Sequence, residues 1–176
     1  YTYPATVTYV LQACKKSGVK VMVLDRPNPL GGEVIEGATL DSKLVDGGLT
    51  TLAAIPTRHG LTLGELALYL NSKLQINADL TVVPMKDYTR HSDWASTGMP
   101  WTPPSPALVS SDQAIYYSVF GAFEAGNFAV GRGTTNELAF KVIGAPWISD
   151  SARTKLVARL KAVAGLQTEA DDWIVS

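Results

Sequence analysis

Residues 19–32 read Val-Lys-Val-Met-Val-Leu-Asp-Arg-Pro-Asn-Pro-Leu-Gly-Gly, and this stretch decides the fold class of the 176-residue chain. Its first six residues form a near-continuous apolar run of strand length, which is typical of a buried strand in a parallel sheet. Two prolines then stiffen the following loop, and two glycines allow it to turn sharply. Ligands in open α/β sheets bind beyond the carboxyl ends of the strands. The stretch therefore predicts a strand that leads into a polar site.

Helical patterns surround this strand. Apolar residues recur at helical spacing over residues 5–17, and Thr62 with Glu65 forms a capping box that opens a helix running to about Leu74. Residues 80–83 then indicate a second buried strand. The order helix, strand, helix, strand predicts an α/β fold with a partial Rossmann-like parallel sheet. Because such a sheet normally starts with a strand, we expect a fragment of a longer protein, or a chain that another chain completes.

The sequence changes character near residue 95, where prolines and tryptophans gather in a long structured loop. The expected elements beyond it are a helix opened by Ser110 and Gln113, a strand over residues 140–143, and a last helix after Ser149 with Leu156, Leu160 and Val163 facing inward. We therefore predict the C-terminal portion of a Rossmann-like domain over residues 1–95 and a smaller α+β domain over residues 96–176.

Composition narrows the possible functions. Hydrophobic residues make up 46% and charged residues 18% of the chain, as in folded globular proteins. The net charge is −1 and Lys/Arg blocks do not exceed two residues, which argues against a nucleic-acid partner. The sequence contains neither an apolar run of the ~20 residues that cross a bilayer nor a signal-peptide pattern. The single cysteine, Cys14, lies in a helical pattern and is expected to be a buried, inert thiol.

Three polar residues follow the first strand: Asp25, Arg26 and Asn28. Their position predicts a ligand site, and the alternative is that Asp25 caps a turn and pairs with Arg26. Glu36 lies among apolar neighbours, which favour the protonated form that a general acid needs. The alternative for Glu36 is an exposed carboxylate of a hairpin.

His59 lies just before the capped helix, whose free N–H groups suit an anionic or hydroxyl-rich ligand. No His, Cys or Asp stands at metal-ligand spacing from it, so we expect no metal site. A histidine that is hydrogen-bonded within its loop is the alternative.

The second part of the chain holds its densest polar group. Glu124, Asn127, Arg132 and Thr134 lie within eleven residues on a glycine-rich segment. Arg132 has the chemistry to bind a carboxylate or sugar hydroxyls, although a tight turn with an exposed arginine would show the same pattern. The segment matches neither a P-loop nor a dinucleotide-binding fingerprint. Trp101 stands in a proline-containing stretch, where an aromatic face either stacks on a sugar ring or packs in the core.

Several runs, taken in order, resemble one family. They are Leu24-Asp25-Arg26-Pro27-Asn28-Pro29-Leu30-Gly31-Gly32, Ile55-Pro56-Thr57-Arg58-His59-Gly60-Leu61-Thr62-Leu63-Gly64-Glu65-Leu66-Ala67, Thr97-Gly98-Met99-Pro100-Trp101, Phe123-Glu124 with Asn127, Gly131-Arg132-Gly133-Thr134-Thr135 and Gly144-Ala145-Pro146-Trp147. The chain resembles the bacterial exo-β-N-acetylmuramidases (NamZ-like proteins) from residue 1 to about residue 147. It departs from the usual Glu-Gly-Thr-Asn at residues 124–127.

The resemblance implies a Rossmann-like domain and a smaller α+β domain with the active site in the cleft between them. It implies release of terminal N-acetylmuramic acid from the non-reducing ends of peptidoglycan fragments, without a cofactor, outside the cell or in the periplasm. It also implies a longer protein, whose N-terminal part contributes a catalytic glutamate in a Ser-Pro-Glu-His-Gly-type stretch.

Two hypotheses follow. The first is a glycoside hydrolase with Glu36 and Glu124 as catalytic carboxylates and Asp25 as the next candidate. In this hypothesis, the sugar and its lactyl carboxylate are bound by Arg26, Asn28, His59, Asn127, Arg132, Thr134 and Trp101. The second is a non-catalytic fragment that binds peptidoglycan through the same cleft.

Overall fold

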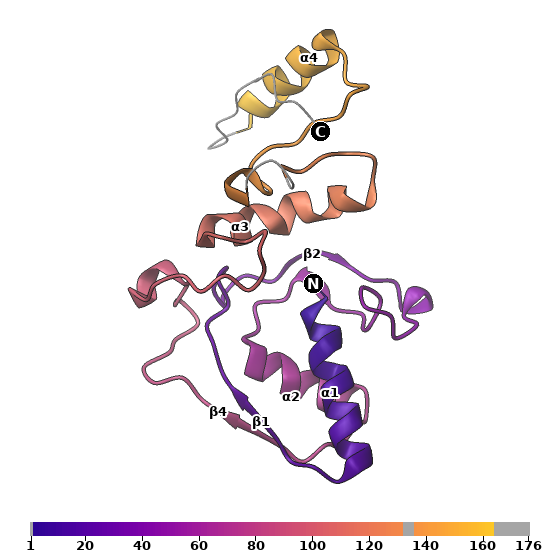
Figure 1. The fold of residues 1–176 in the computed structure, drawn as a ribbon, viewed down its shortest axis with the longest axis vertical. Coiled ribbons are helices and arrows are strands. Elements are labelled where there is room, and N and C mark those ends of the chain that lie inside the picture. Colours follow the sequence, from indigo (N-terminus) through magenta and orange to yellow (C-terminus); the bar gives the residue numbers. More distant parts are fainter. Residues whose placement is uncertain (1, 132–135, 164–176) are drawn as a thin grey trace. The chain divides into compact units, whose positions relative to one another are not determined.

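The computed structural model describes residues 2–131 and 136–163, and contacts divide the chain into two compact units between Pro100 and Trp101 (Figure 1). The boundary that the sequence predicts after residue 95 lies within the first unit. Among the described residues, no helix has the length and apolar character to cross a bilayer.

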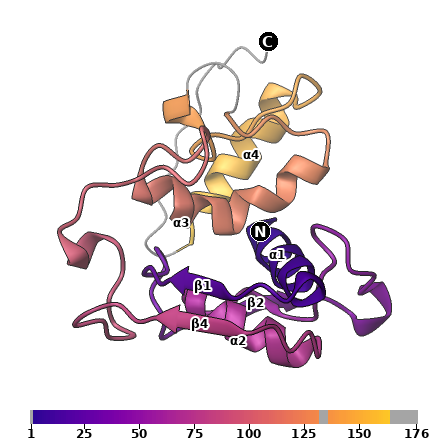
Figure 2. The same ribbon diagram turned by 60° about the horizontal axis from the view of Figure 1, so that its bottom comes forward.

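The first unit begins with α1 (Tyr3–Ser17), which has a proline in its first turn and ends at Gly18 with φ 67°. Strands β1 (Val21–Leu24) and β4 (Leu80–Val83) pair in parallel, as the sequence predicts. Helix α2 (Leu63–Lys73) begins with the expected capping box and packs on both strands (Figure 2). These elements confirm the α/β fold class.

Within the described residues, only one face of the β1–β4 sheet is covered. Residues alternate along both strands between half-buried and exposed, and Val82 faces α2. On the opposite face, Met22 is 66% exposed and Leu24 is 67% exposed. The expectation of buried strands is therefore correct for one face only, although parallel sheets are normally covered on both.

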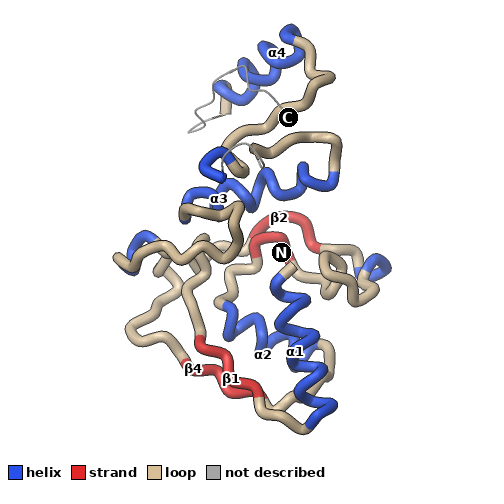
Figure 3. Tube along the Cα trace, viewed as in Figure 1, coloured by secondary structure: helices blue, strands red, loops and turns tan. Residues whose placement is uncertain are grey.

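A second, antiparallel strand pair carries Glu36. Strand β2 (Glu36–Thr39) pairs with β3 (Pro56–Arg58), so that Glu36 lies opposite Arg58 (Figure 3). The segment around Glu36 thus pairs with the distant strand β3 and does not fold on itself as a hairpin. The core of this unit is formed by Ala5, Leu52, Leu66 and Leu70. Cys14 is half-buried, so its expected full burial was wrong.

The second unit contains α3 (Ser111–Phe120), which starts at the predicted capping box and continues as a 3-10 turn over Gly121–Ala125, and α4 (Asp150–Lys161) after Ser149. Its small core centres on Phe140, Val130 and Ala139. The strand predicted over residues 140–143 was wrong, because Phe140 has a φ of 62° that breaks an extended chain. Of the inward residues predicted for the last helix, Leu160 is half-buried, whereas Leu156 is 45% exposed and Val163 is 55% exposed, so the prediction was wrong for those two.

Candidate functional site

Asp25 ties the end of β1 to the start of α2. One carboxylate oxygen accepts hydrogen bonds from the backbone N–H of Arg26 (2.9 Å) and of Gly64 (2.7 Å). The other oxygen accepts from the Thr62 hydroxyl at 2.8 Å. An anion is favoured at this position because the first N–H groups of a helix have no partner within the helix. Asp25 is therefore held as a capping carboxylate, and its catalytic role stays a prediction.

Arg26 pairs with Asp25 only through its backbone. Its guanidinium carbon lies 5.6 Å from the centre of the Trp94 ring, a distance at which a cation and an aromatic face attract each other.

Asn28 and His59 meet at Leu61. The Asn28 amide donates to the Leu61 carbonyl at 3.1 Å and accepts from the backbone N–H of Leu30 at 3.0 Å. The backbone N–H of Leu61 donates to Nδ1 of His59 at 3.0 Å. Because Nδ1 accepts, the proton of the neutral imidazole lies on Nε2. Burial lowers the pKa of His59 and so favours this neutral form, which leaves Nε2–H as a donor for a ligand.

Glu36 has a cationic partner. Its carboxylate accepts from Nη1 of Arg58 at 2.6 Å, and Nη2 of Arg58 donates to the Leu30 carbonyl at 2.7 Å. The Glu36 side chain is 59% exposed. The apolar surroundings that the sequence suggests for Glu36 are thus absent from the described structure, because β2 is a short strand with its side chains in solvent.

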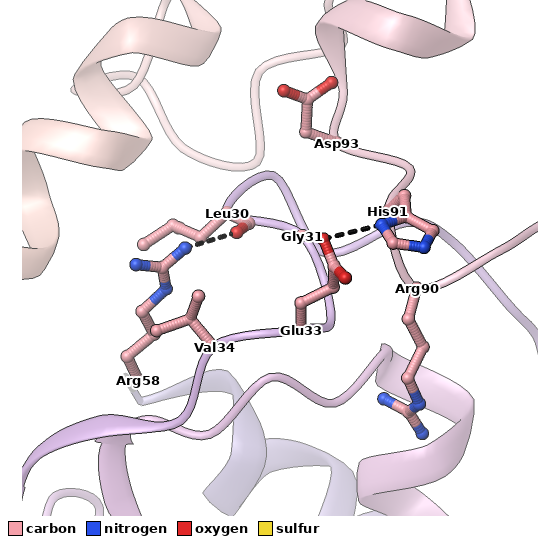
Figure 4. A pocket seen from close by; sticks show the side chains of 8 residues that line it. All are labelled: Leu30, Gly31, Glu33, Val34, Arg58, Arg90, His91 and Asp93. Carbon is pink, nitrogen blue, oxygen red and sulfur yellow. Dashed lines mark hydrogen bonds and ion pairs between the residues drawn. The ribbon is translucent and has the colours of Figure 1, made fainter.

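A hollow of about 200 Å³ lies beside this pair (Figure 4). It is smaller than most ligand sites, which measure roughly 300–1,000 Å³. Figure 4 shows Arg58 on one side and the ion pair between His91 Nδ1 and Glu33 Oε2 (2.7 Å) on the other. Its lining is formed by Leu30, Gly31, Glu33, Val34, Arg58, Arg90, His91 and Asp93, which include none of the residues predicted for the site.

Arg90 is a central residue of this region that the sequence did not indicate. Its guanidinium donates to the carbonyls of Gly60 (3.1 Å) and Gly32 (3.4 Å) and forms an ion pair with Glu65 (2.7 Å). Its backbone carbonyl accepts from the N–H of Gly32 at 2.8 Å. No motif surrounds Arg90 in the sequence, so its role depends entirely on contacts with distant segments.

In the second unit, Glu124 and Asn127 are sequence neighbours of Phe123 and Phe128, whose rings pack together. The Phe128 ring lies 5.3 Å from Phe123 and 5.0 Å from Trp147. The Trp147 indole N–H donates to the Asn127 carbonyl at 3.3 Å, and the Trp147 side chain remains 60% exposed. Glu124 is half-buried in the 3-10 turn after α3.

The other predicted residues of this unit are less informative. The Trp101 indole donates to the Leu108 carbonyl at 2.7 Å, and the ring is half-buried. Arg132 and Thr134 lie outside the described residues. Within the described ranges, no group of three His, Cys, Asp or Glu side chains could hold a metal ion.

Comparison with known proteins places the chain in a family. Residues 1–112 match the family described as "Exo-beta-N-acetylmuramidase NamZ, N-terminal", and residues 115–170 match its C-terminal counterpart. The chain is 42% identical over 151 residues to the peptidoglycan β-N-acetylmuramidase NamZ of Bacillus subtilis (strain 168). This alignment covers 86% of the chain but only 36% of that relative.

Two crystal structures of DUF1343 family proteins from Bacteroides fragilis share the fold. One is 34% identical with a TM-score of 0.77, and the match covers 92% of the chain and 42% of that protein. The other is 36% identical with a TM-score of 0.71, covering 85% of the chain and 41% of that protein. The chain thus spans less than half the length of each of these relatives. The two family matches, the identity to the Bacillus protein and the shared fold show that the chain belongs to the NamZ exo-β-N-acetylmuramidase family.

Proposed function

We propose that the protein carrying this chain is a glycoside hydrolase that releases terminal N-acetylmuramic acid from the non-reducing ends of peptidoglycan fragments. Family membership supports the reaction class. One observation carries the proposal for this chain: the side chains of Asn28 and His59 are both hydrogen-bonded to the backbone of Leu61. Asn28 lies in the loop after β1 of the parallel sheet, and His59 lies between β3 and α2. Both residue types have polar groups of the kind that bind a hydroxyl-rich ligand.

The chemistry needs a proton donor and a base, nucleophile or stabilising anion. We assign Glu36, which is paired with Arg58, the second task, as a base or as an anion that stabilises positive charge on the sugar. Glu124 is then the candidate proton donor. The acetamido group of the substrate is an alternative nucleophile, in which case one carboxylate suffices. Asp25 remains the third candidate, with its oxygens occupied by the start of α2.

Substrate binding is assigned to the other predicted residues of the two units. We propose that the set consists of Arg26, Asn28, His59, Trp101, Asn127, Arg132 and Thr134 and that Arg132 binds the lactyl carboxylate, since a guanidinium matches a carboxylate with two parallel hydrogen bonds. No cofactor is needed for this reaction. We further propose a secreted or periplasmic location, where peptidoglycan fragments arise.

The face of the β1–β4 sheet that the described residues leave exposed supports a further part of this proposal. Met22 and Leu24 expose apolar surface on a parallel sheet, and parallel sheets are normally covered on both faces. The relatives are more than twice as long as the matched segment. We propose that the remaining part of the same protein covers this face.

A chromogenic N-acetylmuramide tests the function. The protein that carries the chain should release N-acetylmuramic acid and the chromophore, and the double variant Glu36→Gln, Glu124→Gln should not. Glu137→Gln is the matched control, because Glu137 is an exposed carboxylate of the second unit with no assigned role. Turnover retained in the double variant would refute the catalytic assignments.

A non-catalytic peptidoglycan-binding role is the second candidate. The full hydrogen bonding of Asp25 favours it, because a carboxylate held this way serves structure and not proton transfer. Muropeptides that bind to the protein and are never cleaved would establish this alternative.

A further inference from the structure

We propose that Arg90 is a positioning residue of the candidate site, which fixes the two peptide groups on either side of Leu61 and thereby the side chains of His59 and Asn28. This inference rests on the proposed function, because His59 and Asn28 are assigned there to ligand binding. It assigns Arg90 no contact with the ligand.

Arg90 joins three segments that lie far apart in the sequence. Its guanidinium donates to the carbonyl of Gly60 at 3.1 Å and to that of Gly32 at 3.4 Å, and it pairs with Glu65 at the start of α2 at 2.7 Å. Glu65 in turn accepts from the backbone N–H of Thr62 at 3.0 Å. A guanidinium holds several donors in one rigid plane, whereas a lysine ammonium is a single charge on a flexible stem. Only arginine can therefore serve these acceptors together.

The planarity of the peptide bond carries the effect of Arg90 to the candidate site. The Gly60 carbonyl and the Leu61 N–H belong to one rigid peptide group and point in opposite directions. Arg90 holds the carbonyl, and the N–H donates to Nδ1 of His59 at 3.0 Å. The Leu61 carbonyl, which accepts from the Asn28 amide at 3.1 Å, belongs to the next peptide group. The N–H of that group, on Thr62, donates to Glu65, the ion-pair partner of Arg90. A rotation of the first peptide group would therefore release His59, and a rotation of the second would release Asn28.

Two glycines make room for this arrangement. A Cβ at Gly32 would lie 3.0 Å from the Tyr88 hydroxyl and 3.2 Å from both Nη1 of Arg90 and the Gly60 carbonyl. Gly60 has a φ of 65°, which other residues rarely adopt. The loops around Gly32 and Gly60 thus meet backbone to backbone, with the guanidinium between their carbonyls. Gly32→Ala should disturb the same contacts without altering Arg90 itself.

The Arg90–Glu65 ion pair is partly exposed to solvent, so its effect on ligand binding can be measured apart from its effect on stability. The Arg90 side chain is 50% exposed and that of Glu65 is 32% exposed. Ion pairs that are open to solvent contribute little to stability. We therefore expect Arg90→Lys to fold with a melting temperature close to that of the wild type while ligand binding weakens.

The experiment is a double-mutant cycle on the protein that carries the chain, with the dissociation constant for N-acetylmuramic acid measured by calorimetry. Arg90→Lys should weaken binding roughly tenfold, the effect of losing one charge-assisted hydrogen bond. His59→Gln should weaken binding as well. The double variant should lose less affinity than the sum of the two single losses, because part of the effect of Arg90 runs through His59.

Arg153→Lys is the matched control, since Arg153 forms an ion pair with Asp150 at 3.1 Å on α4 and has no assigned role. Combined with His59→Gln, it should show no coupling. Two further measurements cover the case in which Arg90→Lys fails to fold. Gly32→Ala should reproduce the loss of affinity, and millimolar guanidinium should restore binding to Arg90→Ala while methylammonium should not.

The outcomes separate the two proposals. Binding without turnover in the wild type would end the glycosidase assignment and leave the role of Arg90 open to measurement in the same cycle. Unchanged affinity in Arg90→Lys, or purely additive losses with His59→Gln, would overturn the positioning role. A wild type that binds no N-acetylmuramic acid would overturn both.

Discussion

Replacing Asp25 by alanine should destabilise the first unit through the start of α2. The carboxylate accepts from the Thr62 hydroxyl, from the Gly64 N–H and from the Arg26 N–H. Thr62 is only 1% exposed, and Gly64 is buried, so water cannot easily replace the lost acceptor for either of them. The N–H of Arg26 forms an exposed hydrogen bond and can turn to solvent.

The magnitude follows from these two donors. A buried donor left without an acceptor costs about 1–3 kcal/mol. The free energy of unfolding should therefore fall by about 2–4 kcal/mol in Asp25→Ala. This loss is in the lower part of the range for two buried donors, because Asp25 itself is half-buried. Asp25→Asn keeps one acceptor oxygen and should lose about half as much.

Urea denaturation followed by far-ultraviolet circular dichroism measures this loss. Asp41→Ala is the matched control, because Asp41 also caps a helical turn, with an acceptor distance of 2.9 Å from the N–H of Lys43, but in solvent. Its removal should change the free energy of unfolding by no more than about 0.5 kcal/mol. A loss in Asp25→Ala as small as that of the control would refute the capping role. Normal stability with lost turnover in Asp25→Asn would instead support a catalytic role.

Three other predictions concern the same unit. Gly64→Ala should lower the free energy of unfolding by about 1–3 kcal/mol in urea, because the new Cβ would lie 2.5 Å from a Val82 methyl; the gain that alanine normally gives a helix would contradict this. Leu70→Ala should cost about 2–5 kcal/mol, since Leu70 is fully buried, and Leu68→Ala, at a position 49% exposed, should cost less than about 1 kcal/mol; equal losses would be inconsistent with the described core. His59 has a lowered pKa in the folded chain, so the unfolded chain takes up its proton at a higher pH. Stability should therefore decline as the pH falls below the unfolded value of 6.5, and His59→Gln should reduce this decline in denaturation curves recorded across that range.

Short sequence patterns correctly predicted those helices and strands whose limits are set by residues adjacent in the sequence. The capping box of Thr62 and Glu65 opens α2, and residues 80–83 form β4 with the predicted bounds. The strand over residues 140–143 failed because apolar composition does not reveal the left-handed backbone at Phe140. Short apolar runs fit several structures, and tertiary contacts decide among them.

The candidate site was predicted less well, because its environment depends on distant segments. The position of Asp25 after a strand was correct, but its three hydrogen-bond partners include residues almost forty positions away. Glu36 was expected among apolar neighbours, and its sequence gives no sign that Arg58 would pair with it across two strands. Arg90 carries no motif at all. Side chains that act through long-range contacts leave little signal in a single sequence.

The most direct measurement is mass spectrometry of the products formed from defined peptidoglycan fragments by the protein that carries this chain. The glycosidase proposal predicts free N-acetylmuramic acid and a fragment shortened by one sugar at its non-reducing end. Intact fragments recovered together with the folded protein would contradict it.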